Sequence, residues 1–414
     1  MFRKYFVFRS DNRAKLAALM CRTYPLALLA GALVWQLPEA RGDETRLTVG
    51  NPIILPERLP VVRSGVGTPH DYKPCIAKLP SGELLIVAFR GHGLADGKIR
   101  EDESLFRSLD EGNTWSDAET LSLPGREPYF SMARDGTLFM TAHLTETDIR
   151  NRHGYLHSYL HRSNDGGHTW DSTPLLATDV PGAPASAWTH TSRNVLELSN
   201  GDLILGVSTP GGNDFLWRST DGGKTWDRSL KCVFEGIDPQ KLWWPFMAET
   251  VFWQARNGDL LGIFRVDPKL VPPLPDTETP EAKTDQSERL IVLRSRDGGE
   301  HWTLDKPLGS YYGEMYPAIL RLADGRLLLT FTVRAERTPL GVHAVLGKET
   351  GDGFEFDFHN DRIVIDAKTP TELSSGGGFG PTVQLSDGSL VTAYSYRGED
   401  SATHLEVARW RLNQ

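Results

Sequence analysis

Cysteine is scarce in this chain, with three residues, Cys21, Cys75 and Cys232, among 414. Cys75 and Cys232 lie far apart in the sequence. A disulfide between them is chemically permitted outside the cytoplasm, but small buried side chains are the more common use of such isolated cysteines. Cys21 is not preceded by the small residue typical of a lipoprotein site. We therefore expect neither a disulfide scaffold nor a lipid anchor.

Basic residues are also in deficit. The chain has 45 Lys and Arg against 54 Asp and Glu, which gives a formal net charge of −9. Residues 43–414 keep 38 of the basic and 52 of the acidic side chains, so their net charge is −14. A chain this acidic lacks the general electrostatic footprint of a nucleic-acid-binding protein. We therefore expect no nucleic-acid partner.

A long apolar run is missing as well. The most apolar stretch, residues 26–35, has ten residues, which is too few to span a bilayer comfortably. Basic residues precede it, and Ala40-Arg41-Gly42 follows it as a small-x-small cleavage sequence. This order is typical of a secretory signal. We predict that residues 1–42 are a signal peptide and that residues 43–414 are one mature domain, periplasmic or extracellular, without a membrane span. An uncleaved membrane anchor is the alternative.

The chain is rich in one repeated phrase, which begins with Ser, has Asp at its third position and ends with Trp. The Asp can bond amides of its own turn, and the Gly that usually follows accepts a left-handed conformation. The Trp is large enough to wedge between neighbouring sheets. Successive copies start 55, 56 and 76 residues apart; the longest interval holds a Pro- and acid-rich segment, residues 268–288, which we expect to be an exposed loop. The copies are residues 108–115, 163–170, 219–226 and 295–302.

A second repeat gives the number of structural units. Six times, Asp-Gly, Asn-Gly or Ser-Gly precedes an apolar run, which is a hairpin signal. Six copies with about four strand-like segments each predict an all-β chain folded as a six-bladed β-propeller. A degenerate phrase at residues 351–354 fits the fifth unit, and a strand around residues 46–54 is expected to complete the sixth. The turn glycines are Gly82, Gly136, Gly201, Gly258, Gly325 and Gly388.

Three histidines, His153, His157 and His161, follow one another at the four-residue spacing that metal ligands have on a helix. The repeated phrase that begins at Ser163 requires a strand here instead. On a strand, this spacing spreads the three side chains along one face. We therefore predict neither a metal site nor another cofactor.

The residue nine positions before each turn glycine is expected near the start of an innermost strand. Propellers bind ligands at one mouth of their central channel, where these strands converge. Polar and ionisable residues are enriched at this position, which makes it a candidate site. The six residues are Lys73, Glu127, Ser192, Glu249, Tyr316 and Phe379.

Together, the phrases, the six units and the spacing of these residues resemble the sialidase (neuraminidase) superfamily, whose phrases are called BNR repeats or Asp-boxes. The resemblance covers essentially all of residues 43–414. It implies that Tyr316 is a catalytic nucleophile and that Glu249 is the base that takes its proton. Arg265, 16 residues after Glu249, and Arg289, 27 residues before Tyr316, match arginines that hold an anionic group.

The resemblance also implies that Asp96, in the loop after the first hairpin, is the acid/base residue and that Arg90 is its neighbouring arginine. One departure concerns substrate binding. Where the family has an arginine for the substrate carboxylate, this chain has Tyr72-Lys73. Lysine cannot form the two parallel hydrogen bonds that arginine forms with a carboxylate. Arg193 is the candidate to contribute instead.

The resemblance implies a secreted exo-α-sialidase-like glycoside hydrolase that removes terminal acidic sugars from glycans with retention of configuration. A phenol nucleophile suits an anionic sugar, because a carboxylate nucleophile would be repelled. The departure at Tyr72-Lys73 leaves two alternatives open: a hydrolase or lyase acting on uronic or neutral glycans, and a non-catalytic carbohydrate-binding propeller. Candidates for stacking against a sugar are Trp243, Trp244, Tyr311 and Tyr312.

Overall fold

The computed structural model describes residues 45–241, 244–267, 270–271, 287–334, 339–366, 368–369 and 378–412. This part of the chain consists of strands β1–β27 and three single-turn 3-10 helices, η1 (Ala95–Gly97), η2 (Ala177–Asp179) and η3 (Pro239–Lys241), without an α-helix. The all-β prediction is confirmed. None of the described helices has the length and apolarity needed to cross a bilayer. The predicted signal peptide and most of the predicted loop at 268–288 lie outside the described residues.

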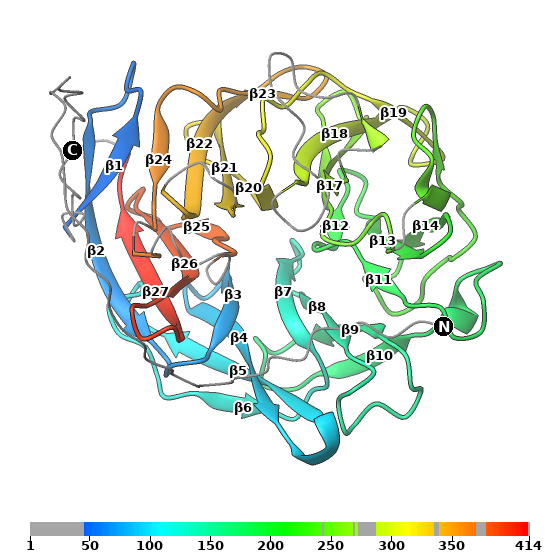
Figure 1. Cartoon of the computed structure of the whole chain (residues 1–414). Coiled ribbons are helices and arrows are strands. Elements are labelled where there is room, and N and C mark those ends of the chain that lie inside the picture. Colours follow the sequence, from blue (N-terminus) through cyan, green and yellow to red (C-terminus); the bar gives the residue numbers. More distant parts are fainter. Residues whose placement is uncertain are drawn as a thin grey trace, which may run out of the picture. The chain divides into compact units, whose positions relative to one another are not determined.

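Successive strands pair into sheets that follow one another in chain order around a common centre, with β3, β7, β20 and β25 close to it (Figure 1). The first sheet contains β3 (Tyr72–Lys78), β4 (Leu84–Gly93), β5 (Ile99–Ser108) and β6 (Glu119–Leu121). The second contains β7 (Arg126–Met132), β8 (Leu138–Leu144), β9 (His157–Ser163) and β10 (Asp171–Leu175). The third contains β11 (His190–Thr191), β12 (Leu196–Glu197), β13 (Leu203–Thr209) and β14 (Asn213–Ser219). The fourth contains β15 (Val233–Phe234), β16 (Val251–Gln254), β17 (Leu260–Val266), β18 (Arg289–Ser295) and β19 (His301–Leu304).

The remaining ten strands form one sheet, in the order β20-β21-β22-β24-β1-β2-β27-β26-β25, with β23 paired to β22. The strand predicted around residues 46–54 was wrong in its partner. β1 pairs with β24 and β2, and it is β2 that pairs with the C-terminal β27. The nine residues of β2 allow both pairings, because Arg58–Pro60 pair with β1 and Val61–Val66 pair with β27. Both β1 and β2 bury apolar side chains in the core that contains Trp410. The ten strands of this sheet are β1 (Arg46–Gly50), β2 (Arg58–Val66), β20 (Glu314–Arg321), β21 (Arg326–Val333), β22 (Gly341–Glu349), β23 (Phe354–Phe356), β24 (Arg362–Val364), β25 (Thr382–Gln384), β26 (Leu390–Arg397) and β27 (Thr403–Trp410).

Each copy of the repeated phrase folds into the same turn, which we call the Ser-x-Asp turn. In the first copy, Thr114 donates to Asp110 from its backbone N at 2.9 Å and from its hydroxyl at 2.6 Å, while Gly112 N donates to Ser108 Oγ at 2.8 Å. The second and third copies repeat these bonds. In the fourth copy a histidine, His301, takes the place of the threonine. All of these bonds stabilise the turn itself.

Buried apolar side chains gather in six large clusters, most of which combine neighbouring units. The tryptophans that end the Ser-x-Asp turns belong to this packing: Trp302 is fully buried, and Trp170 stacks on Phe130 with ring centroids 6.3 Å apart. One cluster packs side chains of β26 and β27 against those of β3, β4 and β5. Packing thus brings the two ends of the described chain together.

The isolated cysteines and the histidine row are structural. Cys75 and Cys232 are both free and buried, as predicted. His157 and His161 lie on β9, a strand as expected, and both are fully buried. The ring of Tyr159 lies between them, with its centroid 5.3 Å from that of His157 and 5.5 Å from that of His161.

Candidate active site

One position recurs in five units with the same unusual backbone. Lys73, Glu127, Glu249, Tyr316 and Phe379 all have left-handed φ values between 49° and 65°, which are costly for side chains that carry a Cβ atom. At three of them the pairing of the innermost strand is shifted, as in a β-bulge. These five are the residues nine positions before their turn glycines. The structure brings Lys73, Tyr316 and Phe379 into contact, Lys73 also pairs with Glu127, and Glu249 is linked to the others through arginines.

In the third unit, the residue that reaches the centre is eight and not nine positions before the turn glycine. Ser192 bonds within its own sheet, where its Oγ lies 2.9 Å from Asn194 O and 3.0 Å from Gly206 N. Its neighbour Arg193 reaches the centre instead and is only 3% exposed.

Ion pairs link these side chains into a row of alternating charge, which we call the central ion row. Arg193 Nη2 lies 3.1 Å from Glu127 Oε2 and 3.2 Å from Glu249 Oε1. On one side, Lys73 Nζ pairs with Glu127 Oε1. On the other side, Arg265 Nη1 lies 2.6 Å from Glu249 Oε2. Each of the three cations in the row therefore already contacts a carboxylate of the chain.

The ring of Tyr316 is surrounded by cations. The distances to its centroid are 4.9 Å from Lys73 Nζ, 5.4 Å from Arg193 Cζ, 5.5 Å from Arg265 Cζ and 4.7 Å from Arg334 Cζ. The Tyr316 hydroxyl lies 3.4 Å from Arg265 Nη1. The direct hydrogen bond expected between Tyr316 and Glu249 is not formed. Arg265 Nη1 instead contacts both of them.

Burial and charge together set the protonation of the row. Burial alone would raise the pKa of Glu127, but Lys73, followed by His143 and Arg193, holds that pKa well below its usual value. Burial opposes the charge of Lys73, yet Glu127 holds its pKa above the ordinary value. Burial raises the pKa of Tyr316, against the effect of Arg334. At neutral pH the site therefore holds a carboxylate, an ammonium and a neutral phenol.

Tyr72 and Arg334 meet beside this phenol. Arg334 Nη2 donates to the Tyr72 hydroxyl at 3.0 Å, and Lys73 Nζ lies 5.3 Å from the centroid of the Tyr72 ring. Tyr72 therefore lines the site as an acceptor for an arginine. The sequence resemblance did not identify Arg334, because no pattern links this residue, just after β21, to Tyr72 on β3.

Two further predicted residues lie nearby. Trp244 is half-buried, with its ring 5.2 Å from Arg265 Cζ, whereas Trp243 lies outside the described residues. Arg289 begins β18, is buried, and has its Cζ 6.0 Å from the centroid of the Tyr312 ring. Burial lowers the pKa of Arg289.

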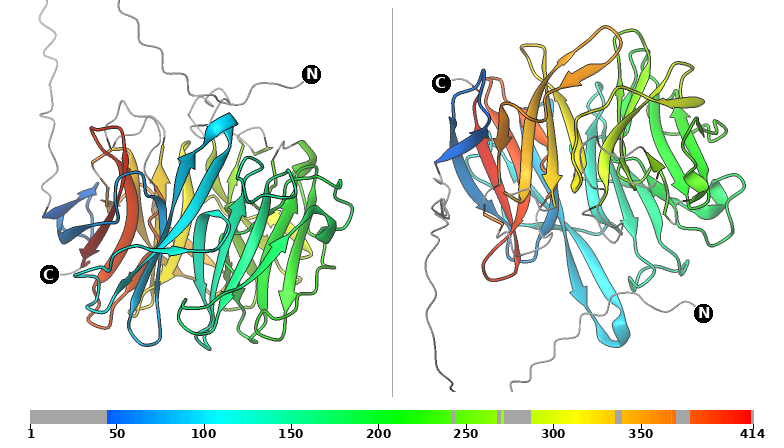
Figure 2. Two further views of the ribbon diagram at one scale, coloured as in Figure 1. Left: turned by 90° about the horizontal axis from the view of Figure 1, so that it is seen from below. Right: turned by 45° about the horizontal axis from the view of Figure 1, so that its top comes forward.

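The structure does not bring Asp96 and Arg90 into contact with the central ion row. β4 and β5 form a long hairpin that extends beyond the neighbouring sheets (Figure 2), and Asp96 lies at its exposed tip in η1. Among the contacts of the described residues, none joins Asp96 to Tyr316 or Glu249. Arg90 pairs with Asp71 Oδ1 at 2.8 Å. The ten-residue strands of the hairpin carry its tip away from the centre.

The first three sheets supply polar groups that sequence reasoning missed. Arg126 Nη2 lies 3.6 Å from Glu127 Oε1, and Arg126 Nη1 lies 3.4 Å from Glu101 Oε1. His143 Nε2 lies 3.8 Å from Glu127 Oε2, and the His143 and His190 rings are 4.6 Å apart. Burial lowers the pKa of both histidines. Arg126 could have been identified from the sequence because it precedes Glu127. His143 could not, because it comes close to Glu127 only through the pairing of β8 with β7, in which it lies opposite Arg126.

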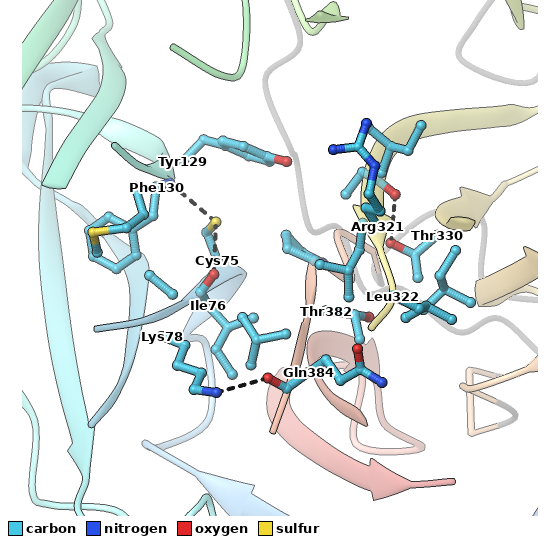
Figure 3. A pocket seen from close by; sticks show the side chains of 18 of the residues that line it. Cys75, Ile76, Lys78, Tyr129, Phe130, Arg321, Leu322, Thr330, Thr382 and Gln384 are labelled. Atoms are coloured by element: carbon cyan, nitrogen blue, oxygen red, sulfur yellow. Dashed lines mark hydrogen bonds between the residues drawn. The ribbon is translucent and has the colours of Figure 1, made fainter. Parts of the chain in front are cut away.

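Below the central ion row, a cavity of about 620 Å³ opens between the innermost strands. Its walls include Cys75 and Tyr129, which follow Lys73 and Glu127 by two residues and so lie roughly 7 Å further along their strands. Figure 3 shows Tyr129 extending from β7, with Arg321 on the opposite side of the cavity. Ion pairs thus form one level of the centre, and mainly neutral side chains form the next.

No protein-family model matches the chain, and neither does any curated protein. Solved structures match it in fold. A protein of unknown function from Dyadobacter fermentans is 20% identical, with a TM-score of 0.62 over 85% of this chain and 99% of that chain. The intramolecular trans-sialidase from Ruminococcus gnavus is 13% identical, with a TM-score of 0.56 over 82% and 94%. The Hadza microbial sialidase Hz136 is 16% identical, with a TM-score of 0.54 over 83% and 65%. The chain therefore has a sialidase-like fold.

Proposed function

We propose that residues 43–414 are one domain, a six-bladed β-propeller. Two observations on its described residues support this count: the six large apolar clusters and the left-handed position that recurs in five units. The ten-stranded sheet then corresponds to two blades. One is β20–β23, the other is β25–β27 with β2, and β1 and β24 bridge the two.

We further propose that this propeller is a sialidase-like exo-glycosidase with Tyr316 as its nucleophile. The observation that carries the proposal is the buried Tyr316 phenol with four cations between 4.7 and 5.5 Å from its ring centroid. Loss of the phenol proton creates an anion, which such cations stabilise. Glu249 shares Arg265 Nη1 with the phenol and is the base. Catalytic hydrogen bonds that are absent without substrate often form in the Michaelis complex.

The proposed reaction has two steps. In the first step Glu249 takes the Tyr316 proton, the Tyr316 oxygen attacks the anomeric carbon as the bond to the leaving oxygen breaks, and the acid protonates that oxygen. In the second step water attacks the anomeric carbon and gives a proton to the acid, while the sugar–tyrosine bond breaks and Glu249 returns the proton to the Tyr316 oxygen. The assignment of Asp96 as this acid rests on the sequence resemblance alone. The sequence resemblance assigns the anionic group of the sugar to Arg265 and Arg289; because Arg265 already pairs with Glu249 and Glu288, a substrate anion would compete with these two carboxylates.

The test is turnover of aryl-sialosides and of aryl glycosides of uronic acids by the mature chain, residues 43–414. Tyr316→Phe is expected to lower turnover by about a thousandfold or more. Tyr396→Phe is the matched control, because the ring contacts described for Tyr396 are with His404 and Lys368 and not with the central ion row. Full activity of Tyr316→Phe would refute the proposed nucleophile. Asp96→Asn, measured alongside, tests the acid separately.

Two observations favour a second candidate, a non-catalytic carbohydrate-binding propeller. Tyr316 and Glu249 lack a direct hydrogen bond, and each cation of the central ion row already contacts a carboxylate. Binding on a glycan array without any released product, for wild type and Tyr316→Phe alike, would select this candidate.

The proposal includes secretion to the periplasm or beyond the cell. It is supported by the basic start, the apolar run and the small-x-small sequence at residues 40–42. Mature protein that begins after Gly42, as measured by N-terminal sequencing, is the expected outcome. An intact N-terminus in the membrane fraction would indicate the anchor instead.

A further inference from the structure

Three cations converge on one carboxylate of the central ion row, that of Glu127. Lys73 Nζ pairs with Glu127 Oε1, Arg193 Nη2 lies 3.1 Å from Glu127 Oε2, and Arg126 Nη2 lies 3.6 Å from Glu127 Oε1. The cations come from three places: β3, β7 and the segment between β11 and β12. Side chains gathered from separate units on one carboxylate have the composition of a carboxylate-binding site.

The carboxylate is held there at a cost. Both Lys73 and Glu127 have left-handed backbones, with φ values of 49° and 53°, and both side chains are nearly buried, with 6% and 11% exposed. Burial of a cation is tolerated only when an anion accompanies it. The cations therefore require a negative group at this point, and Glu127 supplies it.

We propose that Glu127 occupies, from within the chain, a carboxylate-binding site formed by Lys73, Arg126 and Arg193, and so determines which part of a sugar can approach these cations. A second carboxylate about 4 Å from Glu127 would meet a repulsion that weakens binding by roughly a thousandfold. The sugar group that meets Glu127 is then a donor, a hydroxyl or an amide N–H.

This inference takes from the proposed function only that a sugar binds at the centre. Its test measures anion binding, so it does not depend on catalysis. A chain without glycosidase activity can still confirm it, and an active chain can still refute it.

The test uses Glu127→Ala, which removes CH2–COO⁻, a fragment with the size and charge of acetate. We expect sodium acetate to raise the thermal unfolding temperature of this variant saturably, because a ligand that binds only the folded state stabilises it. The resulting Kd should be at least about tenfold lower than for wild type. Sodium chloride at the same ionic strength should not reproduce the effect.

Two controls separate the space from the charge. Glu127→Gln removes the charge but fills the space, so acetate should not stabilise it more than chloride does. Glu101→Ala removes another buried carboxylate that pairs with Arg126 but, among the described contacts, not with Lys73 or Arg193. Acetate should therefore bind it no better than it binds wild type.

If Glu127→Ala does not fold, the double variant Lys73→Met/Glu127→Ala removes a buried cation together with the anion and leaves Arg126 and Arg193 in place. Acetate should still stabilise it more than chloride does. Acetate and chloride acting equally on the Ala variants would overturn the proposal, because the cations would then not form a carboxylate site. Equal acetate binding by wild type and Glu127→Ala would overturn it as well.

Discussion

Arg63 joins the N-terminal strand β2 to three other parts of the fold. Its Nη1 lies 3.1 Å from Glu406 Oε2 and bonds the Tyr394 hydroxyl, and its Nη2 donates to Ile365 O at 2.7 Å. The Arg63 and Glu406 side chains are only 11% and 6% exposed. Breaking a buried ion pair costs about 3–5 kcal/mol, because the remaining charge stays buried. Lys368 still contacts Glu406, so Arg63→Ala should lower the unfolding free energy by about 3 kcal/mol.

Equilibrium urea unfolding measures this loss as a lower midpoint with an unchanged slope. Arg58→Ala is the matched control on the same strand, because Arg58 is exposed and bonds Thr48 Oγ1 at 3.0 Å; it should cost less than about 0.5 kcal/mol. The double variant Arg63→Ala/Glu406→Gln should lose less than the sum of the single variants. If Arg63→Ala costs no more than Arg58→Ala, then apolar packing alone fastens β2.

Three further predictions concern stability. Burial raises the pKa of Asp214 to about 8, so the folded chain keeps a proton that the unfolded chain releases above about pH 4. The free energy of unfolding of the wild type should therefore fall between about pH 4 and 8, and Asp214→Asn should reduce this slope and add roughly 1–3 kcal/mol at pH 7. Urea unfolding that gives wild type and variant the same dependence on pH would contradict this. A Cβ atom added at Gly299 (φ 108°) would lie 2.3 Å from Leu216 Cδ2, whereas one added at Gly298 (φ 78°) would meet its nearest atom at 3.5 Å. Gly299→Ala should therefore lower the unfolding free energy by about 1–3 kcal/mol more than Gly298→Ala does, as measured by urea unfolding. The aspartate of the fourth Ser-x-Asp turn raises the pKa of His301. The wild type should therefore be more stable than His301→Thr at acidic pH, and this difference should disappear as the pH rises past the pKa of His301. A difference in unfolding temperature that is constant with pH would refute this.

The periodic features of the fold were predictable from sequence, and the exceptions have local causes. Turn chemistry depends on a few adjacent residues, so the hairpins at the turn glycines and the Ser-x-Asp turns could be inferred. The pairing of β2 with β27 could not, because both N-terminal strands bury apolar side chains in the core that contains Trp410, so the apolar pattern does not identify the partner of β27.

The site was predictable to the extent that the repeat spacing fixes one position per unit. It identified Lys73, Glu127, Glu249 and Tyr316, which meet at the centre. It failed in the third unit by one residue. Asp96 was assigned by the resemblance instead, and its position at the exposed tip of the β4–β5 hairpin depends on strand length and twist, which no spacing in the sequence records.

The charges along the central ion row follow a rule that the sequence itself contains. In unit order the row reads Lys73, Glu127, Arg193 and Glu249, so each charged residue has neighbours of opposite sign. Burial makes this alternation necessary, since an unpaired cation or two adjacent carboxylates at this depth would destabilise the fold. The next two units supply Tyr316 and the apolar Phe379, where no charge continues the alternation. The cations around the Tyr316 ring come from units before and after these two as well as from the unit of Tyr316 itself. Tyr316 is thus a neutral, ionisable group at the point where the alternation stops, and in the proposed reaction it is the group whose charge changes.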